Sequence, residues 1–145
     1  MTENIPSHSF DEIKIGTKAR FTVTIDENMI TDFASVSGDY NPLHMDENYA
    51  RTTNFKKRVC HGMLLGSFFS RLVGMHLPGK NSLYFSQTLN FQAPCFVGET
   101  VFIEGEVTDK SESTRIITIK TVAYDHLGKC LVDGIAKVMV RDNLG

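Results

Sequence analysis

The 145-residue sequence predicts a single α+β domain in which an antiparallel β-sheet wraps around one long apolar helix. Two observations indicate this fold class. The segment 62–75 is apolar on nearly every side, and a helix without a polar face is normally buried. From residue 81 onward, apolar side chains recur at every second position, which is typical of β-strands. Because each apolar face must find a partner, the helix is expected to lie inside a bent sheet.

Composition limits the kinds of partner and compartment. The 15 Lys and Arg residues nearly balance 17 Asp and Glu residues, so no nucleic acid partner is expected. The apolar segment is shorter than the roughly 18 to 20 residues that cross a bilayer, and the N-terminus has no basic region followed by an apolar run. We therefore expect a soluble, cytoplasmic protein with no membrane partner. The wide spacing of Cys60, Cys95 and Cys130 favours free, buried or half-buried thiols over disulfides or a metal site.

The single domain is expected to span residues 1–145. Its amino-terminal part is predicted to form a strand and then a helix. Apolar residues alternate with threonines up to Ile25, as in a half-buried strand. Asp26 is suited to cap the following helix, and Ile25 and Ile30 can pack across that cap. Residues 1 to about 9 are polar and contain Pro6, so they are expected to be loose. The inner stripe of the helix consists of Met29, Ile30, Phe33 and Ala34.

The carboxyl-terminal part is predicted to form a β-meander. Four alternating stretches are separated by short turns, and strands joined by short turns pair antiparallel. The stretches are residues 83–91, 101–107, 117–123 and 132–140, with turns at 97–99 and 125–128.

The segment between the two predicted helices carries the residues best suited to chemistry. Asp39, Asn41 and His44 place a carboxylate, a carboxamide and an imidazole within six residues. Pro42 lacks a backbone N–H and favours an extended residue before it, so the preceding helix must end here. On a helix Asp39 and His44 would lie roughly 140° apart, so only a bent loop can direct both into one cleft. A second short helix, capped by Asp46, is expected next.

The start of the apolar helix has its own signals. Gly66, inside the helix, indicates that another segment packs close to the backbone. His61 either helps the loop that positions Gly62 or is a packed, hydrogen-bonded histidine. The basic residues 56–58 could meet a phosphate-bearing ligand, although a solvated surface is the favoured interpretation. The hydroxyl of Ser67 is expected to bond the backbone one turn back.

The stretch 37–46, Ser-Gly-Asp-Tyr-Asn-Pro-Leu-His-Met-Asp, resembles the signature of the (R)-specific enoyl-CoA hydratases, which are also called MaoC-like or hydratase 2 enzymes. The resemblance continues through Cys-His-Gly-Met-Leu at 60–64 and Leu-Pro-Gly at 77–79, and it covers most of the chain. It implies a hot-dog fold, in which the sheet wraps around the helix 62–75. It also implies a homodimer with active sites near the subunit boundary.

The same resemblance implies roles for individual residues. Asp39 and His44 would form a catalytic pair holding one water, with Asn41 in the same motif and the Gly62 backbone N–H as oxyanion donor. These groups suit the reaction, because adding water to an enoyl thioester needs a base, an acid and donors for the charge on the thioester oxygen. A helix N-terminus supplies such N–H donors. No metal or redox cofactor is needed.

The predicted reaction is syn addition of water to a trans-2-enoyl-CoA, giving an (R)-3-hydroxyacyl-CoA, or the reverse dehydration. An acyl carrier protein thioester or a branched dicarboxylyl-CoA is an alternative substrate, and the sequence does not decide which member of the catalytic pair is the base. The side chains expected around the acyl group are Tyr40, Leu43, Met63 and Leu65.

Functions other than hydration are also compatible with parts of the pattern. A hot-dog module that binds acyl-CoA or another protein without chemistry is the alternative from a different class. A thioesterase is a further alternative, although the motif matches the hydratases. Asp-x-Asn-Pro by itself is also typical of a simple turn.

Overall fold

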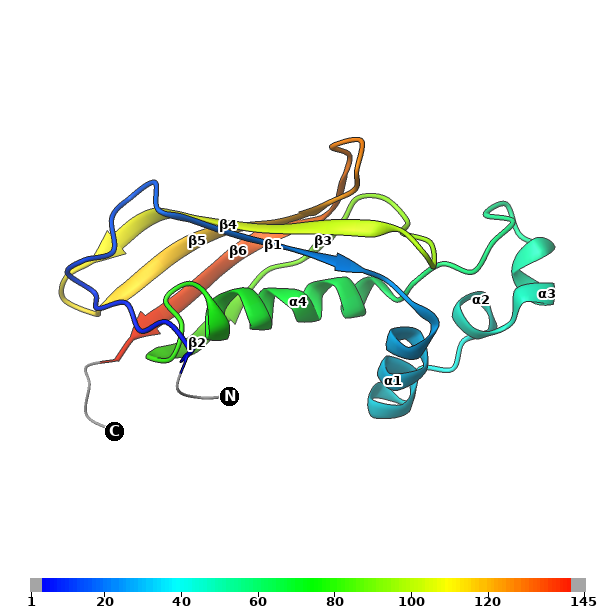
Figure 1. Cartoon of the computed structure of the whole chain (residues 1–145), viewed down its shortest axis with the longest axis horizontal. Helices are drawn as coiled ribbons and strands as arrows, with labels where there is room; N and C mark the ends of the chain where they lie inside the picture. Colours follow the sequence, from blue (N-terminus) through cyan, green and yellow to red (C-terminus); the bar gives the residue numbers. More distant parts are fainter. Residues whose placement is uncertain (1–3, 142–145) are drawn as a thin grey trace.

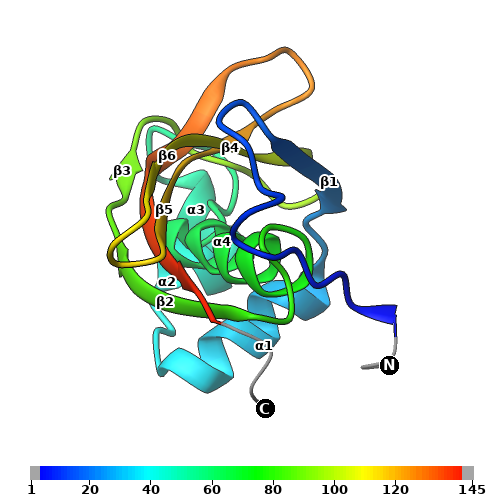
Figure 2. The same cartoon turned by 90° about the vertical axis from the view of Figure 1, so that its left-hand side faces the viewer.

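The computed structural model describes residues 4–141, and in it one bent sheet wraps around a central helix, α4 (Figure 2). Three shorter helices form a group beyond the N-terminal end of α4 (Figure 1). The helices are α1 (Glu27–Ser37), α2 (Pro42–Met45), α3 (Glu47–Arg51) and α4 (Gly62–Met75). The strands are β1 (Lys18–Thr24), β2 (Ser82–Gln87), β3 (Asn90–Phe91), β4 (Thr100–Ser111), β5 (Ile116–Tyr124) and β6 (Cys130–Val140).

The sheet has the order β1-β4-β5-β6-β2, and the short strand β3 also pairs with β6. Every neighbouring pair is antiparallel. The predicted pairing of the last three strands is therefore confirmed, with Val107 opposite Ile119 and Ile119 opposite Ala136.

The predicted first strand of the meander is wrong in two respects. The stretch 83–91 is divided into β2 and β3, and both pair with β6 rather than with β4, the next long strand in the chain. The break between β2 and β3 lies at Thr88, which packs against the backbone of β6. A Cβ at Gly134 of β6 would lie only 1.7 Å from the carbonyl oxygen of Thr88, so the two backbones are in direct contact. After β3 the chain passes the segment that leads into α4, where the backbone carbonyl oxygen of Cys95 accepts a hydrogen bond of 2.7 Å from the backbone N–H of Cys60.

Helix α4 forms the centre of the core, as the sequence predicted. Five of its side chains are buried against the sheet, and the glycines of both elements let them approach closely. A Cβ at Gly105 of β4 would lie 2.7 Å from Leu72 Cδ2, and one at Gly66 would lie 3.0 Å from Leu89 Cδ1. The second distance confirms that another segment packs against the backbone at Gly66. The buried residues of α4 are Leu64, Leu65, Phe69, Leu72 and Val73.

Local signals in the amino-terminal part are also confirmed. Asp26 caps α1 by accepting a hydrogen bond of 2.9 Å from the backbone of Met29. Ile25 and Ile30 are fully buried in one cluster, as expected for residues that pack across the cap. Gly38 ends the helix in a left-handed conformation (φ 79°) that suits glycine.

The residues before β1 are held against the turn that follows α4. The carbonyl oxygen of Pro6 accepts a hydrogen bond of 2.8 Å from Lys80, and Ser7 forms a bridge with Gly79. Residues 6–8 are thus bonded where the sequence suggested a loose segment, whereas residues 1–3 lie outside the described part.

Two further expectations concern the whole described range. Among residues 4–141, no helix has the length and apolar character needed to cross a membrane. Cys60 and Cys95 are free and buried, and Cys130 is free and half-buried, which confirms the predicted state of the thiols.

Candidate active site

Asp39 lies in the short loop between α1 and α2, where its own neighbours hold it. Its backbone N–H donates to Ser37 Oγ (3.1 Å), and its Oδ1 accepts from the backbone N–H of Asn41 (3.1 Å). The second carboxylate oxygen, Oδ2, faces His44, and about half of the Asp39 side chain is exposed.

His44 is carried by α2, a four-residue helix that the sequence analysis did not predict. Pro42 occupies its first turn, and the Asn41 side chain caps it by accepting from the backbone N–H of Leu43 (3.0 Å). The prediction that one bent loop carries both Asp39 and His44 is therefore wrong for His44, because the loop ends at Asn41 and a helix begins at Pro42. A proline whose missing N–H costs nothing at a helix start explains why the helix begins here.

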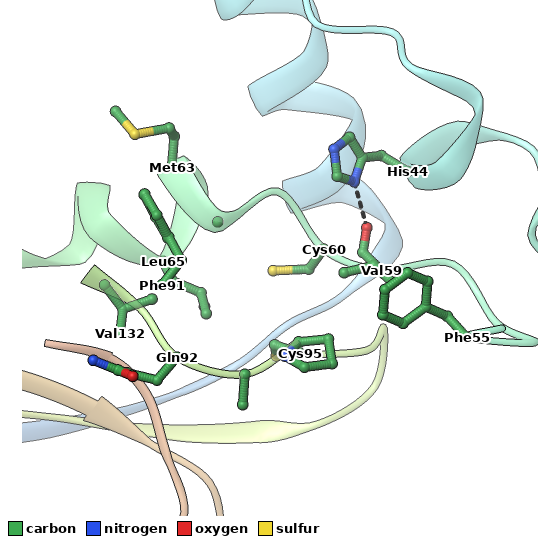
Figure 3. A pocket seen from close by; sticks show the side chains of 13 residues that line it. His44, Phe55, Val59, Cys60, Met63, Leu65, Phe91, Gln92, Cys95 and Val132 are labelled. Carbon is green, nitrogen blue, oxygen red and sulfur yellow. Dashed lines mark hydrogen bonds between the residues drawn. The ribbon is translucent and has the colours of Figure 1, made fainter. Parts of the chain in front are cut away.

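The imidazole of His44 has a defined orientation. Its Nδ1 lies 2.6 Å from the carbonyl oxygen of Val59, drawn as the dashed line in Figure 3. A carbonyl oxygen only accepts, so Nδ1 carries the hydrogen, and in the neutral ring Nε2 is the acceptor. This Nε2 lies 3.9 Å from Asp39 Oδ2, beyond direct hydrogen-bond distance but suited to a bridging donor.

Arg58 fixes the backbone that carries His44. Its Nε donates to the carbonyl oxygen of His44 (2.6 Å), and its Nη1 lies 2.8 Å from both carboxylate oxygens of Glu27 on α1. Because Arg58 is already paired within the protein, only Lys56 and Lys57 of the basic residues 56–58 are left to contact a phosphate-bearing ligand. The ammonium of Lys57 lies 4.9 Å from the centre of the Phe96 ring.

A cavity of about 460 Å³ adjoins His44 and the start of α4. Gly62, the first residue of α4, lines it together with His44. Gly62 also has little room for a side chain, because a Cβ there would lie 2.7 Å from Phe91 Cδ1. The first N–H groups of a helix lack intrahelical partners, so this end of α4 can offer donors to a ligand in the cavity.

The remaining walls of the cavity are mostly apolar, as Figure 3 shows. Of the four side chains predicted around the acyl group, Met63 and Leu65 line the cavity. Tyr40 (59% exposed) and Leu43 do not. Both neighbour a residue that faces the site, and the backbone turns successive side chains in different directions. The other wall residues are Phe55, Val59, Cys60, Phe91, Gln92, Ala93, Pro94, Cys95 and Val132.

Most of these wall residues carry no local sequence signal that would predict their position. Phe91 and Val132 fall within the alternating stretches 83–91 and 132–140, but nothing in the local sequence places either beside α4. The cysteines at 60 and 95 were recognised as buried thiols, and both line the cavity. Only the close approach implied by a glycine at position 62 could have indicated a ring there.

Asp39, His44 and His61 each offer a possible metal-ligand atom, and these atoms lie within 4.8 Å of one another. The two imidazoles, however, are stacked, with ring centres 4.1 Å apart and planes 28° apart. Histidine binds a metal in its ring plane at about 2.0 to 2.1 Å, so two stacked rings cannot direct their lone pairs at one ion. The arrangement suits proton transfer better than metal binding.

The family to which this site belongs follows from comparison with known proteins. The family model described as "MaoC like domain" matches residues 10–128. The chain belongs to the MaoC-like family. Among curated MaoC-like relatives, an (R)-specific enoyl-CoA hydratase of Aeromonas caviae is 42% identical, over 90% of this chain and 97% of that protein. One of Rhodospirillum rubrum is 41% identical, over 92% of each.

Solved structures of MaoC-like proteins confirm the hot-dog fold. The (R)-hydratase from A. caviae superposes with a TM-score of 0.87 at 42% identity, covering 89% of this chain and 98% of that one. An R-hydratase from Pseudomonas aeruginosa in the unliganded form superposes with a TM-score of 0.92 at 37% identity, covering 96% and 89%. The fold class that the sequence predicted is therefore correct.

Proposed function

We propose that this protein is a hydro-lyase that adds water to trans-2-enoyl-CoA and yields (R)-3-hydroxyacyl-CoA, or catalyses the reverse dehydration. One observation carries the proposal. Two proton acceptors, Asp39 Oδ2 and His44 Nε2, face each other at 3.9 Å beside an apolar cavity that also includes the N-terminus of α4. Relatives that match over nearly their whole length are named (R)-specific enoyl-CoA hydratases, which supports the same assignment.

In the proposed reaction, one water donates a hydrogen bond to each member of the pair. Its oxygen bonds to the β-carbon of the substrate as Asp39 or His44 takes one proton, and that proton is then delivered to the α-carbon on the same face. The negative charge that gathers on the thioester oxygen is stabilised by the Gly62 N–H. Asn41 supports the pair by capping α2 and by holding Asp39 Oδ1 with its backbone N–H.

The acyl group is proposed to occupy the apolar cavity, where Met63 and Leu65 supply part of the wall. Burying the acyl chain there removes apolar surface from water, at about 25 cal/mol per Å². The charged part of a CoA or acyl carrier protein thioester would remain outside. The cytoplasmic location stays a prediction.

We also propose that the protein acts as a homodimer, joined edge to edge through its sheets. Strand β2 is one end of the sheet order, and an unpaired edge invites pairing. Two large apolar side chains on this strand, Leu83 and Phe85, are about half exposed. Sedimentation equilibrium tests this proposal: a monomer at micromolar concentration would exclude it.

The decisive experiment for the reaction follows the loss of enoyl absorbance with crotonyl-CoA. Asp39→Asn and His44→Ala should each lower kcat by about 10² to 10⁴, because each removes one partner of the proton transfer. Circular dichroism serves as the folding control. Near-normal turnover by either folded variant would exclude the assigned pair.

The same assay separates the alternatives. A thioesterase would release free CoA thiol, which a thiol reagent detects. A binding module would retain acyl-CoA without altering it. Chiral analysis of the product then tests the (R) configuration.

A further inference from the structure

His61 is the residue whose contacts the proposed mechanism leaves unexplained. It is 2% exposed and lies directly before Gly62, at the N-cap position of α4. Its side chain makes no capping hydrogen bond to that helix. It turns instead toward the loop that carries Asp39.

One nitrogen of His61 reaches the backbone of Asp39. Nε2 lies 2.9 Å from the Asp39 carbonyl oxygen, and because a carbonyl only accepts, Nε2 carries the hydrogen. The hydrogen bonds that Asp39 makes with Ser37 and Asn41 span two residues and shape only the loop itself. The bond from His61 spans 22 residues. Among the hydrogen bonds recorded for Asp39 in the described range, it is the one that ties this residue to another part of the chain.

The ring of His61 also supports His44. The two imidazoles are stacked with centres 4.1 Å apart, and Phe33 contacts His61 with ring centres 4.9 Å apart. Two residues earlier, the carbonyl oxygen of Val59 holds His44 Nδ1. Within the segment 59–62, Val59 thus contacts His44 and His61 contacts Asp39. The segment ends at Gly62, the proposed oxyanion donor.

The second ring nitrogen of His61, Nδ1, is buried and makes no hydrogen bond that would stabilise the fold within residues 4–141. Leaving such an acceptor unpaired costs about 1 to 3 kcal/mol, which a purely apolar ring of similar size would avoid. The hydrogen bond from Nε2 to the Asp39 carbonyl is therefore the polar contact that distinguishes histidine from an apolar ring at this position.

We propose that His61 is a positioning residue, which sets the Asp39 carboxylate relative to His44 and to the Gly62 N–H through its Nε2–H hydrogen bond. This inference rests on the proposed hydratase function. His61 itself neither touches the reacting atoms nor transfers a proton. Its effect is geometric, and a displacement of about 1 Å in an active site can cost on the order of 10² in rate.

Two substitutions separate the hydrogen bond from the ring. His61→Phe keeps a flat ring against His44 but removes the donor. His61→Gln removes the ring, yet its amide nitrogen can reach about as far as Nε2 and donate to Asp39. We expect His61→Phe to lower kcat for crotonyl-CoA by roughly 10²-fold with KM changed by less than about twofold. His61→Gln should recover at least about tenfold of that loss.

The outcomes are distinguishable. If His61→Phe retains wild-type kcat, or if the folded Phe and Gln variants are equally slow, the proposed role of the hydrogen bond is wrong. If His61→Phe does not fold, His61→Asn replaces it, because its amide is one methylene too short to reach Asp39. Equal kcat for Asn and Gln would then overturn the inference. Failure of the wild-type protein to hydrate crotonyl-CoA would instead contradict the proposed function.

Discussion

The two ends of α4 have different surroundings, although they belong to one helix. At the carboxyl-terminal end, Leu72 and Val73 are buried, and Leu72 packs against the bare backbone of Gly105. At the amino-terminal end, Gly62 and Met63 line an open cavity, and Met63 is 56% exposed. One end closes the core, and the other leaves apolar surface uncovered for a ligand. An apolar helix therefore need not contribute to stability along its whole length.

The largest effect expected from this contrast is on stability at the closed end. Leu72→Ala removes a fully buried side chain and should lower the free energy of unfolding by about 2 to 5 kcal/mol. Met63→Ala, about two and a half turns away at the open end, is the matched control and should cost clearly less. Urea unfolding of both variants measures the difference. Equal losses would show that the open end is as tightly packed as the closed one.

A smaller effect is expected at the open end, on catalysis. A methyl group at position 62 would lie 2.7 and 2.9 Å from two Phe91 ring carbons. Gly62→Ala should therefore displace this half-exposed ring, which forms part of the cavity wall. We expect kcat/KM for crotonyl-CoA to fall by about tenfold, equivalent to about 1.4 kcal/mol.

A double-mutant cycle with Phe91→Ala identifies the cause of that loss. If the ring transmits the effect, Gly62→Ala should cost much less in the Phe91→Ala background. Strictly additive losses would instead indicate that the methyl group obstructs the substrate itself.

The smallest effect concerns thiol reactivity and leaves the fold intact. A hydrogen bond with Cys60 and burial both raise the pKa of the Cys95 thiol, so it stays protonated as the pH rises toward 9. Alkylation requires the thiolate. Burial and the nearby Asp133 carboxylate also raise the pKa of Cys130, but its side chain is only half-buried whereas that of Cys95 is 1% exposed. Iodoacetamide at pH 8 should therefore modify Cys130 first and Cys95 only after denaturation. Peptide mass spectrometry measures both rates, and rapid labelling of Cys95 in the folded protein would show that this wall opens.

How far the sequence predicted the structure depends on the range of each interaction. The cap at Asp26 and the close contact at Gly66 are local, and both predictions are confirmed. Ser67 likewise bonds the backbone of Leu64 (2.6 Å), as expected. The pairing of β2 with β6 was missed because partners separated by about fifty residues leave no periodic signal.

The site shows the same division. The segment containing Asp39, Asn41 and His44 was recognised from its composition and its resemblance to a family, and the structure brings Asp39 and His44 within 3.9 Å. The contact between His61 and Asp39 joins residues 22 positions apart, so spacing alone could not distinguish it from ordinary packing. The position of Phe91 in the cavity wall likewise depends on how β3 passes α4.

The guanidinium of Arg58 has a consequence for transplanting this active site into another protein. It binds Glu27 in α1 and the backbone of His44 in α2, so two helices are anchored through a single side chain. Grafting residues 37–46 alone onto a related scaffold would leave that anchor behind. A transferable unit has to include Glu27 and Arg58 as well, although neither would show up in a search for reactive groups.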